Sequence, residues 1–377
     1  MTTRTVLASA IAAAVLATAT SAGAIELKYS SWTPPLAPNN RAGTIPLFAA
    51  IEKETKGTPN EITFKNFMGA QLFNSHTTLA GIRDGAVDAG VIVPQYTAAE
   101  LKTQTMLGET QPFNRDGWSA AGASNEVLLL GCPQCAEDYD KNNALTLGVY
   151  AGSPFVLQCS FEPKSMADLK GRKMAGGNPA NARWAASLGM STIQMGPGDM
   201  LQTLQRGTAD CIFGPKEWLF GYGLKDAVKQ VVDNQTFGTY AQVALMTLNK
   251  NSWGKLSSTQ KGIVIKHMPA TIARVVNTYL TNDARGEKEG RERGVKFVKW
   301  GPEWANAWKA FQAKEPANIR EAGEKRGVKD AQKLIDAQIA AYRKWEGFVD
   351  RAGGMAGMTE AKFADLLREH VYAKLVF

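Results

Sequence analysis

The chain has 377 residues, of which 44% are hydrophobic and 21% are charged, as is ordinary for a globular protein of about two domains. The formal net charge of +8 comes from scattered Lys and Arg residues that are interrupted by Glu. This pattern is typical of solvated helix faces and argues against a nucleic-acid-binding surface.

The first 24 residues predict a secretory signal peptide. Arg4 supplies a weak positive region, residues 6–19 are largely apolar, and Ala22, Gly23 and Ala24 form a small-residue cleavage site. We therefore expect export, with cleavage after Ala24. The apolar run is shorter than the roughly 20 residues that a membrane anchor needs. No Cys lies near the cleavage site, so a lipid anchor is not expected.

Strands and helices alternate along the first part of the mature chain. Strands are predicted at 26–32, 62–66 and 89–93, and helices at 40–54 and 71–83. The third strand is nearly continuous in apolar residues, as expected of a strand covered on both faces. This alternation predicts a sheet with crossover connections, and ligands bind where such strands end.

The four Cys residues are too few to build a disulfide-rich fold in a chain of this size. Cys132 and Cys135 form a CxxC pair that most simply predicts a local disulfide. Haem attachment would need His at position 136, where Ala136 stands, and zinc would need more ligands than three distant His residues provide. Cys159 and Cys211 either form a bridge or stay as small buried side chains, and the sequence leaves both open.

The stretch 165–215 shows the same alternation in compact form. Extended segments are predicted at 172–175, 193–195 and 209–213. One helix starts at Asn178 or Asn181 and ends before Gly189, and a second one follows Gly198.

The rest of the chain reads as further strands followed by helices. Extended segments are predicted at 146–150, 155–161, 240–249 and 294–298. The segment 256–293 keeps a helical period throughout, with Pro269 early in it, and 302–377 is helical by pattern.

The inventory of catalytic motifs is poor. The sequence has no Gly-x-Ser-x-Gly elbow, no His-Glu-x-x-His and no P-loop, and none of its three His residues stands beside a candidate nucleophile. We therefore expect no catalytic residue, no cofactor and no metal site. An exported hydrolase with an unrecognised site is the minor alternative.

Several short motifs resemble the solute-binding proteins of tripartite ATP-independent periplasmic (TRAP) transporters, of the dicarboxylate (DctP-like) type. The family pattern S-x-x-D-L-K-G-x-K-[ILM]-R corresponds to 165–175, and the family's L-G, Q-x-G-x-x-D and strand-to-loop passages follow it. The matching segments in this chain, including those before and after this stretch, are 55–57, 71–72, 85–88, 111–113, 165–174, 188–189, 205–210, 214–215 and 249–253.

The resemblance implies an α/β fold of the two-lobed periplasmic-binding-protein kind (type II-like). Each lobe would be a mixed sheet flanked by helices, with a long lobe-spanning helix and a helical C-terminal region. The implied division is lobe I at 25–153 plus 240–256, lobe II at 154–239 plus 294–377, and a connecting helix at 257–293.

The resemblance also implies a function. The protein would be a periplasmic receptor that closes over a small organic solute and delivers it to TRAP-type membrane subunits, without nucleic acid and without a lipid anchor. A sensor module of the same fold is the alternative role.

The family's ligand-contacting positions fall on an unusual set of residues here. The Arg that clamps the ligand carboxylate falls on Ala175, a second frequent Arg on Phe155, and a polar strand-end residue near Gly214. In the first lobe the contacts fall on Trp32, Val93, Gln95 and Tyr96, and Trp184 and Trp218 are further candidate ring platforms.

Two interpretations of this pattern remain open. Closing two lobes over an unpaired carboxylate costs several kcal/mol, so the missing clamp predicts a neutral, cationic or aromatic solute. Alternatively, the solute keeps its carboxylate and another cation replaces the clamp, with Arg183 the foremost candidate, followed by Lys216, Arg172 and Arg41.

Overall fold

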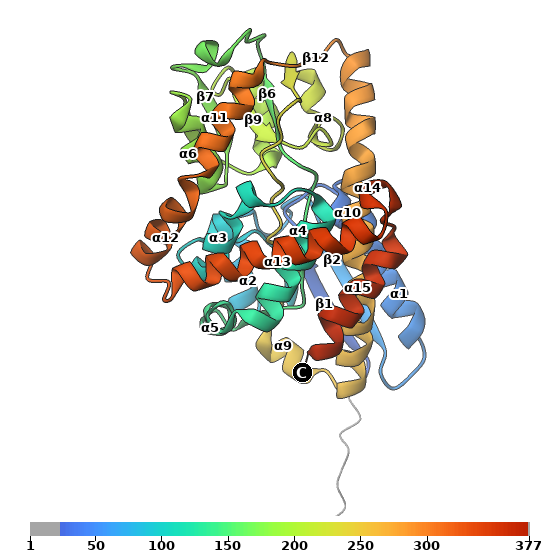
Figure 1. Ribbon diagram of the computed structural model, residues 1–377. Coiled ribbons are helices and arrows are strands. Elements are labelled where there is room, and N and C mark those ends of the chain that lie inside the picture. The colour runs from blue at the N-terminus through green and yellow to red at the C-terminus, as the bar shows by residue number, and fades with distance from the viewer. Residues whose placement is uncertain (1–22, 376–377) are drawn as a thin grey trace, which may run out of the picture.

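The computed structural model describes residues 23–375, in two lobes that are each built on a six-stranded sheet (Figure 1). The predicted signal peptide lies almost entirely at 1–22, outside the described residues. The expected two-lobed α/β architecture is confirmed. Within the described residues, no helix combines the length and apolar character that crossing a membrane requires.

The first sheet is mixed. β1 pairs in parallel with β2 and β3, whereas β11 returns antiparallel to β3, β4 and β5. The central strand β3 is buried along its whole length, which explains its apolar sequence. In order across the sheet, with β5 beside β11, the strands are β2 (Ile62–Phe67), β1 (Ile25–Ser30), β3 (Ala89–Ile92), β11 (Val243–Asn249), β4 (Ala144–Thr146) and β5 (Val149–Tyr150).

The second sheet carries the stretch that resembles the family. β7 pairs in parallel with β8 and β9, and β6 pairs antiparallel with β9 and β10. In order across the sheet the strands are β12 (Lys296–Val298), β10 (Gln230–Val232), β6 (Val156–Cys159), β9 (Cys211–Gly214), β7 (Lys173–Gly176) and β8 (Ser191–Gln194).

Short helices cover both sheets. The first lobe has α1 (Ile45–Thr55), α2 (Thr78–Arg83), α3 (Lys102–Gly108), α4 (Gly117–Glu126), α5 (Pro133–Lys141) and α9 (Lys250–Lys255). The second lobe has α6 (Pro179–Ser187), α7 (Met200–Gln205) and α8 (Trp218–Gly221). The helix predicted at 71–83 forms only as α2, because the Asn74 side chain accepts hydrogen bonds from the backbone N–H groups of His76 and Thr77 and holds a turn instead.

A single long helix, α10 (Ser258–Glu292), joins the lobes along one side of the molecule (Figure 1). A capping box of Ser257 and Gln260 starts it, and Pro269 is accommodated within it. It packs on α1 in the first lobe and on α8 in the second. Two extended segments, 151–155 and 238–242, also cross between the sheets, so the lobes are connected at several points.

The C-terminal helices divide between the lobes, which corrects the prediction that 294–377 belongs to lobe II. Only α11 (Pro302–Gln312) joins the aromatic core of the second lobe. The others pack with the first lobe: α12 (Glu315–Lys325), α13 (Ala331–Arg351), α14 (Gly354–Gly357) and α15 (Glu360–His370). α13 crosses α4 so closely that a Cβ on Gly122 would lie 2.0 Å from Trp345 Cε3.

Both Cys pairs form disulfides. Cys132 and Cys135 close the predicted local ring at the start of α5. Cys159 and Cys211, which the sequence left open, are directly opposite each other on β6 and β9 and are bonded. The second bridge therefore joins two central strands of the lobe II sheet, 52 residues apart in the chain.

The two bridges differ in the length of chain that they close, and this predicts different contributions to stability. By chain-entropy arithmetic the bridge between Cys159 and Cys211 stabilises the fold by about 4 kcal/mol and the ring between Cys132 and Cys135 by about 2 kcal/mol. We expect the double variant C159A/C211A to lower the free energy of unfolding in denaturant by about twice as much as C132A/C135A. An equal loss from both would contradict this account.

Candidate ligand-binding site

A cavity lies between the lobes, where strands of both sheets end. It encloses ≈ 680 Å³ of space free of atoms, part of it open to solvent. Trp32 and Val93 follow β1 and β3 on the first lobe, and Gly177 and Pro215 follow β7 and β9 on the second. This is the position that the alternation of strands and helices predicted for a ligand.

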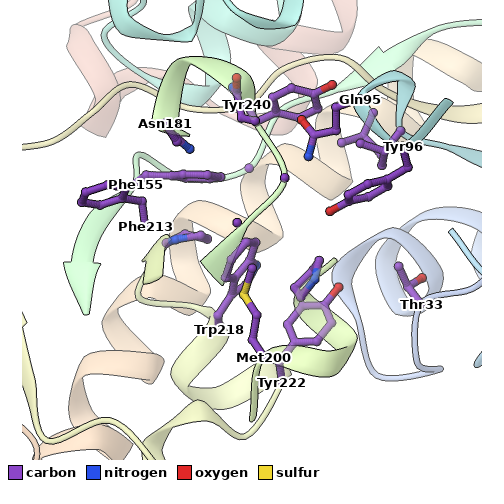
Figure 2. A pocket seen from close by; sticks show the side chains of 18 of the residues that line it. Thr33, Gln95, Tyr96, Phe155, Asn181, Met200, Phe213, Trp218, Tyr222 and Tyr240 are labelled. Atoms are coloured by element: carbon purple, nitrogen blue, oxygen red, sulfur yellow. The ribbon is translucent and has the colours of Figure 1, made fainter. Parts of the chain in front are cut away.

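The walls of the cavity are predominantly aromatic (Figure 2). The first-lobe sheet, its loops and the segment that returns to it contribute Trp32, Tyr96, Tyr150 and Tyr240. The second lobe contributes Phe155, Phe213, Trp218 and Tyr222, and α10 contributes Tyr279. No charged side chain within residues 23–375 lines the cavity.

The rings hold one another in place. Trp32 and Tyr96 meet edge to face with centroids 5.8 Å apart, and Tyr150 stacks on Tyr279 at 5.8 Å. On the opposite side Phe155 packs against Trp218 at 5.5 Å. Such pairs stabilise one another beyond their buried area, so the walls are preorganised for a flat or apolar ligand.

The cavity also offers a few uncharged polar atoms. Trp32 Nε1, Gln95 Oε1 and the Tyr240 hydroxyl are buried and have no hydrogen-bond partner in the part of the chain that the structure describes. Burial raises the pKa of Tyr96 to about 12 and that of Tyr240 well above its ordinary value, so both hydroxyls stay protonated at neutral pH. These groups can both donate hydrogen bonds to a ligand and accept them.

Six of the predicted contacts line this cavity: Trp32, Val93, Gln95, Tyr96, Phe155 and Trp218. Four others, Ala175, Arg183, Trp184 and Gly214, do not.

Ala175 and Gly214 lie one layer behind the cavity wall. Ala175 is fully buried in a cluster with Met200, and it is the Met200 side chain that reaches the cavity. Gly214 is covered by a wall residue, since a Cβ there would lie 2.4 Å from Trp218 Cε3. The position at which the resemblance placed the clamp, Ala175, is therefore occupied by apolar packing.

Trp184 belongs to the core of the second lobe, not to the cavity. It is 1% exposed, and its ring packs against Trp304, Trp308 and Phe311 at centroid distances of 5.2 to 5.4 Å. These partners come from α11, which follows Trp184 by more than a hundred residues, so no local pattern distinguishes a core ring from a wall ring here.

Arg183, the foremost candidate for a relocated clamp, is bound to carboxylates of the protein itself. Its guanidinium donates to Glu109 Oε2 at 2.6 Å and to Glu315 Oε2 at 2.7 Å. Both carboxylates are fully buried, and Arg326 also pairs with Glu109. The network joins α6 in the second lobe to α3 and α12, so Arg183 serves as a link between the lobes.

The other candidate cations also stay out of the cavity lining. Lys216 pairs with Glu287 on α10 at 2.7 Å, and Arg172 pairs with Asp210 at 3.2 Å. Arg41 is half-buried, and its buried Nε and Nη2 have no hydrogen-bond partner among the described residues, but its charge acts on Glu217 and it does not line the cavity. These placements weaken the relocated-clamp interpretation.

Sequence reasoning missed several aromatic wall residues. Tyr150 and Phe213 stand near strand ends and Tyr240 in a crossing segment, where an aromatic residue was a detectable signal. Met200, Tyr222 and Tyr279 carried none, because α7, the end of α8 and the middle of α10 bring them to the cavity.

Glu217, directly before the wall residue Trp218, is a buried acid close to the cavity. Its side chain lies between α8 and α10, and its backbone N–H donates to Asp283 Oδ1 at 2.9 Å. Burial, followed by the charge of Asp283, raises the pKa of Glu217 to about 8, and burial raises the pKa of Asp283 to about 6.

If Arg183 is structural, its removal must destabilise the fold, because the buried Glu315 loses its cation and the buried Glu109 keeps only Arg326. We expect Arg183→Ala to lower the free energy of unfolding by about 3 kcal/mol. The exposed pair of Arg368 and Asp365 provides a control, and Arg368→Ala should change stability by less than about 1 kcal/mol. A stable Arg183→Ala variant that binds solute more weakly would instead assign Arg183 to the ligand.

The raised pKa of Glu217 predicts a pH dependence of stability. The unfolded chain titrates Glu near 4.3, so from there to about pH 8 the folded protein binds more protons than the unfolded one. Stability therefore falls as the pH rises through this window, and Glu217→Gln removes that loss. We expect the Tm of the variant, relative to the unchanged protein, to rise between pH 5 and pH 9. A constant difference would show that Glu217 is ionised throughout.

Solved structures of similar fold include several TRAP solute-binding proteins. A TRAP periplasmic solute-binding protein from Bordetella bronchiseptica, with bound (R)- and (S)-mandelate, has 20% identity and a TM-score of 0.72, and the match covers 85% of this chain and 99% of that one. A TRAP solute-binding protein from Rhodoferax ferrireducens, with copurified benzoate, has 19% identity and a TM-score of 0.75, and the match covers 86% of this chain and 99% of that one. A marine metagenome receptor specific for aromatic acids, with 3-hydroxybenzoate, has 21% identity and a TM-score of 0.74 over 86% and 99%.

A comparison with curated proteins finds no match. The family model of the bacterial extracellular solute-binding proteins, family 7 (DctP), matches residues 42–321, which is most of the chain. The chain therefore belongs to this family of TRAP-type solute-binding proteins, as its short motifs predicted.

Proposed function

We propose that this protein captures a small organic solute that lacks a carboxylate in the cavity between its lobes and delivers it to TRAP-type membrane subunits. We further propose that it is exported to the periplasm, with its signal peptide removed after Ala24. Family and fold support a binding protein and not an enzyme. Ligand binding would favour the closed arrangement of the lobes by population shift.

The observation that carries this proposal is the absence of any charged side chain from the cavity lining among the described residues. A micromolar ligand has only about 8 kcal/mol of net binding energy. Burying a carboxylate without a partner costs several kcal/mol of this. Since Arg183 and Lys216 are held by Glu109, Glu315 and Glu287, neither compensates without breaking an existing ion pair.

The aromatic walls support the same proposal. Nine rings line a cavity whose polar atoms are uncharged, so stacking and a few hydrogen bonds supply the affinity. The three related structures described above bind aromatic acids, and their solutes share the flat ring that such walls would accept. The carboxylate is the part of those solutes for which this cavity has no partner.

A matched pair of ligands tests the charge preference. We expect benzyl alcohol to bind more tightly than benzoate, by at least tenfold, in titrations followed by the fluorescence of Trp32 and Trp218 and by X-ray scattering for lobe closure. Tight binding of benzoate with weak binding of the alcohol would contradict the proposed preference and restore a carboxylate-binding site.

A gain-of-function variant tests the missing clamp directly. Met200 reaches the cavity from beside Ala175, so Met200→Arg places a guanidinium near the family's clamp position without overfilling the buried Ala175 site. We expect this variant to bind benzoate at least tenfold more tightly than the unchanged protein, as judged by isothermal titration. Met200→Leu, which keeps the wall apolar, serves as the control and should leave benzoate binding weak.

A further inference from the structure

Glu217 is the acid closest along the chain to the aromatic wall, and the receptor function proposed above does not use it. It is 0% exposed, and its carboxyl group forms no ion pair in the described part of the chain. Leaving a buried carboxyl group unpartnered is unfavourable, and such groups are concentrated at functional sites. Its surroundings therefore indicate what it does.

The charge of Glu217 acts on three tyrosines of the cavity wall. The charge of this residue contributes to the raised pKa values of Tyr150, Tyr222 and Tyr279, all of which line the cavity. Trp218, the next residue in the chain, lines it as well. Glu217 also adjoins Tyr222 in space, because a Cβ on Gly221, the residue before Tyr222, would lie 2.3 Å from Glu217 Oε1. Glu217 thus lies behind the part of the wall that Trp218 and Tyr222 form, and Figure 2 shows these two side chains on the same side of the cavity.

The charged groups that face Glu217 come from all the elements packed around it. α10 supplies Asp283, which is itself influenced by Glu287 and by Lys216, the partner of Glu287. The π-helix Asn39–Thr44 supplies Arg41, whose charge favours the ionised form of Glu217. The Asn282 amide, which can donate a hydrogen bond to the carboxylate, favours it too. Two acids therefore share one unpaired cation, and the balance on this side of the cavity becomes negative when both acids ionise.

We propose that the cavity binds an organic cation, with its ammonium group against the ring faces of Tyr150, Tyr222, Tyr279 and Trp218, and that Glu217 ionises as this cation binds. The inference rests on the proposed receptor function and names its substrate class. The proton of Glu217 passes to solvent, and the carboxylate left behind balances the buried charge of the ligand.

Two physical arguments favour a cation over a neutral ring. The faces of Trp and Tyr rings carry negative electrostatic potential, and aromatic cages of this composition bind ammonium groups. In addition, a neutral ligand leaves Glu217 protonated and without a partner, whereas a cation converts it into a compensated carboxylate. An anionic ligand would oppose ionisation of both Glu217 and Asp283.

The test uses three probes that each carry a phenyl ring on a two-carbon chain and differ in the terminal group: 2-phenylethylamine, 2-phenylethanol and phenylacetate. In isothermal titrations of the mature protein at pH 7, the amine should bind at least tenfold more tightly than the alcohol, and phenylacetate most weakly. Titrations in buffers of different ionisation enthalpy should show a proton released per amine bound. Amine affinity should rise from pH 6 to pH 8, because more Glu217 is already ionised in the free protein.

Two variants test whether Glu217 causes the preference for the amine. Glu217→Gln should bring the ratio of amine to alcohol affinity close to one and abolish the proton release, and its alcohol binding reports whether the cavity is intact. Glu287 lies one turn after Asp283 on α10 and is already paired with Lys216. Glu287→Gln should therefore leave the ratio of amine to alcohol affinity unchanged. Should Glu217→Gln fail to fold, the proton release of the unchanged protein decides alone.

The outcomes separate this inference from the function on which it rests. Equal or tighter binding of the alcohol, or amine binding without proton release, overturns the cation proposal while the receptor function stands. Binding of phenylacetate alone overturns it together with the proposed charge preference. If no probe binds and no solute that copurifies with the protein closes the lobes, the receptor function itself fails.

Discussion

The need of every buried charge for a partner organises the region between the lobes. Glu109 and Glu315 are fully buried, and Arg183 and Arg326 compensate them. This network occupies the guanidinium of Arg183, the foremost candidate for a relocated clamp. The cavity beside it is consequently left with rings and uncharged polar atoms, and this follows from the same energetic rule. Structural ion pairs and ligand preference are thus two consequences of one constraint.

The joint between the lobes is built for close approach. At Gly177, after β7, a Cβ would lie 2.6 Å from Gln95 Nε2 and 2.7 Å from Tyr96 Cε1, so only glycine lets the lobes meet there. Gly238, in the returning segment, has a φ of +71° and a Cβ there would collide with the Gln111 carbonyl. The loop 111–113, which resembles a loop of the family, therefore packs closely on the crossing segment at Gly238. Backbone contacts as well as side chains thus fix the positions of the cavity walls.

A disulfide and an aromatic core hold the cavity walls of the second lobe in place. The bridge between Cys159 and Cys211 ties β6 to β9, the strands that lead from Phe155 and into Phe213. Behind them, Trp184 with the rings of α11 fills the core. A solute would therefore meet preformed walls, and the free energy of binding would be used mainly to bring the lobes together.

The sequence by itself determined the two-lobed α/β fold, the family, the long helix and the local disulfide, because each has a signal within a short stretch of chain. It also placed Trp32, Gln95, Tyr96 and Phe155 at strand ends, where they line the cavity. Tertiary structure alone decided which rings are wall and which are core: Trp184 is enclosed by α11, and Tyr279 reaches the cavity from the middle of α10. It also decided that Arg183 forms ion pairs, that Glu217 forms none among the described residues, and that the helices after Gln312 pack on the first lobe. The physical reason is that burial and charge compensation depend on groups far apart in the chain, which no local pattern encodes.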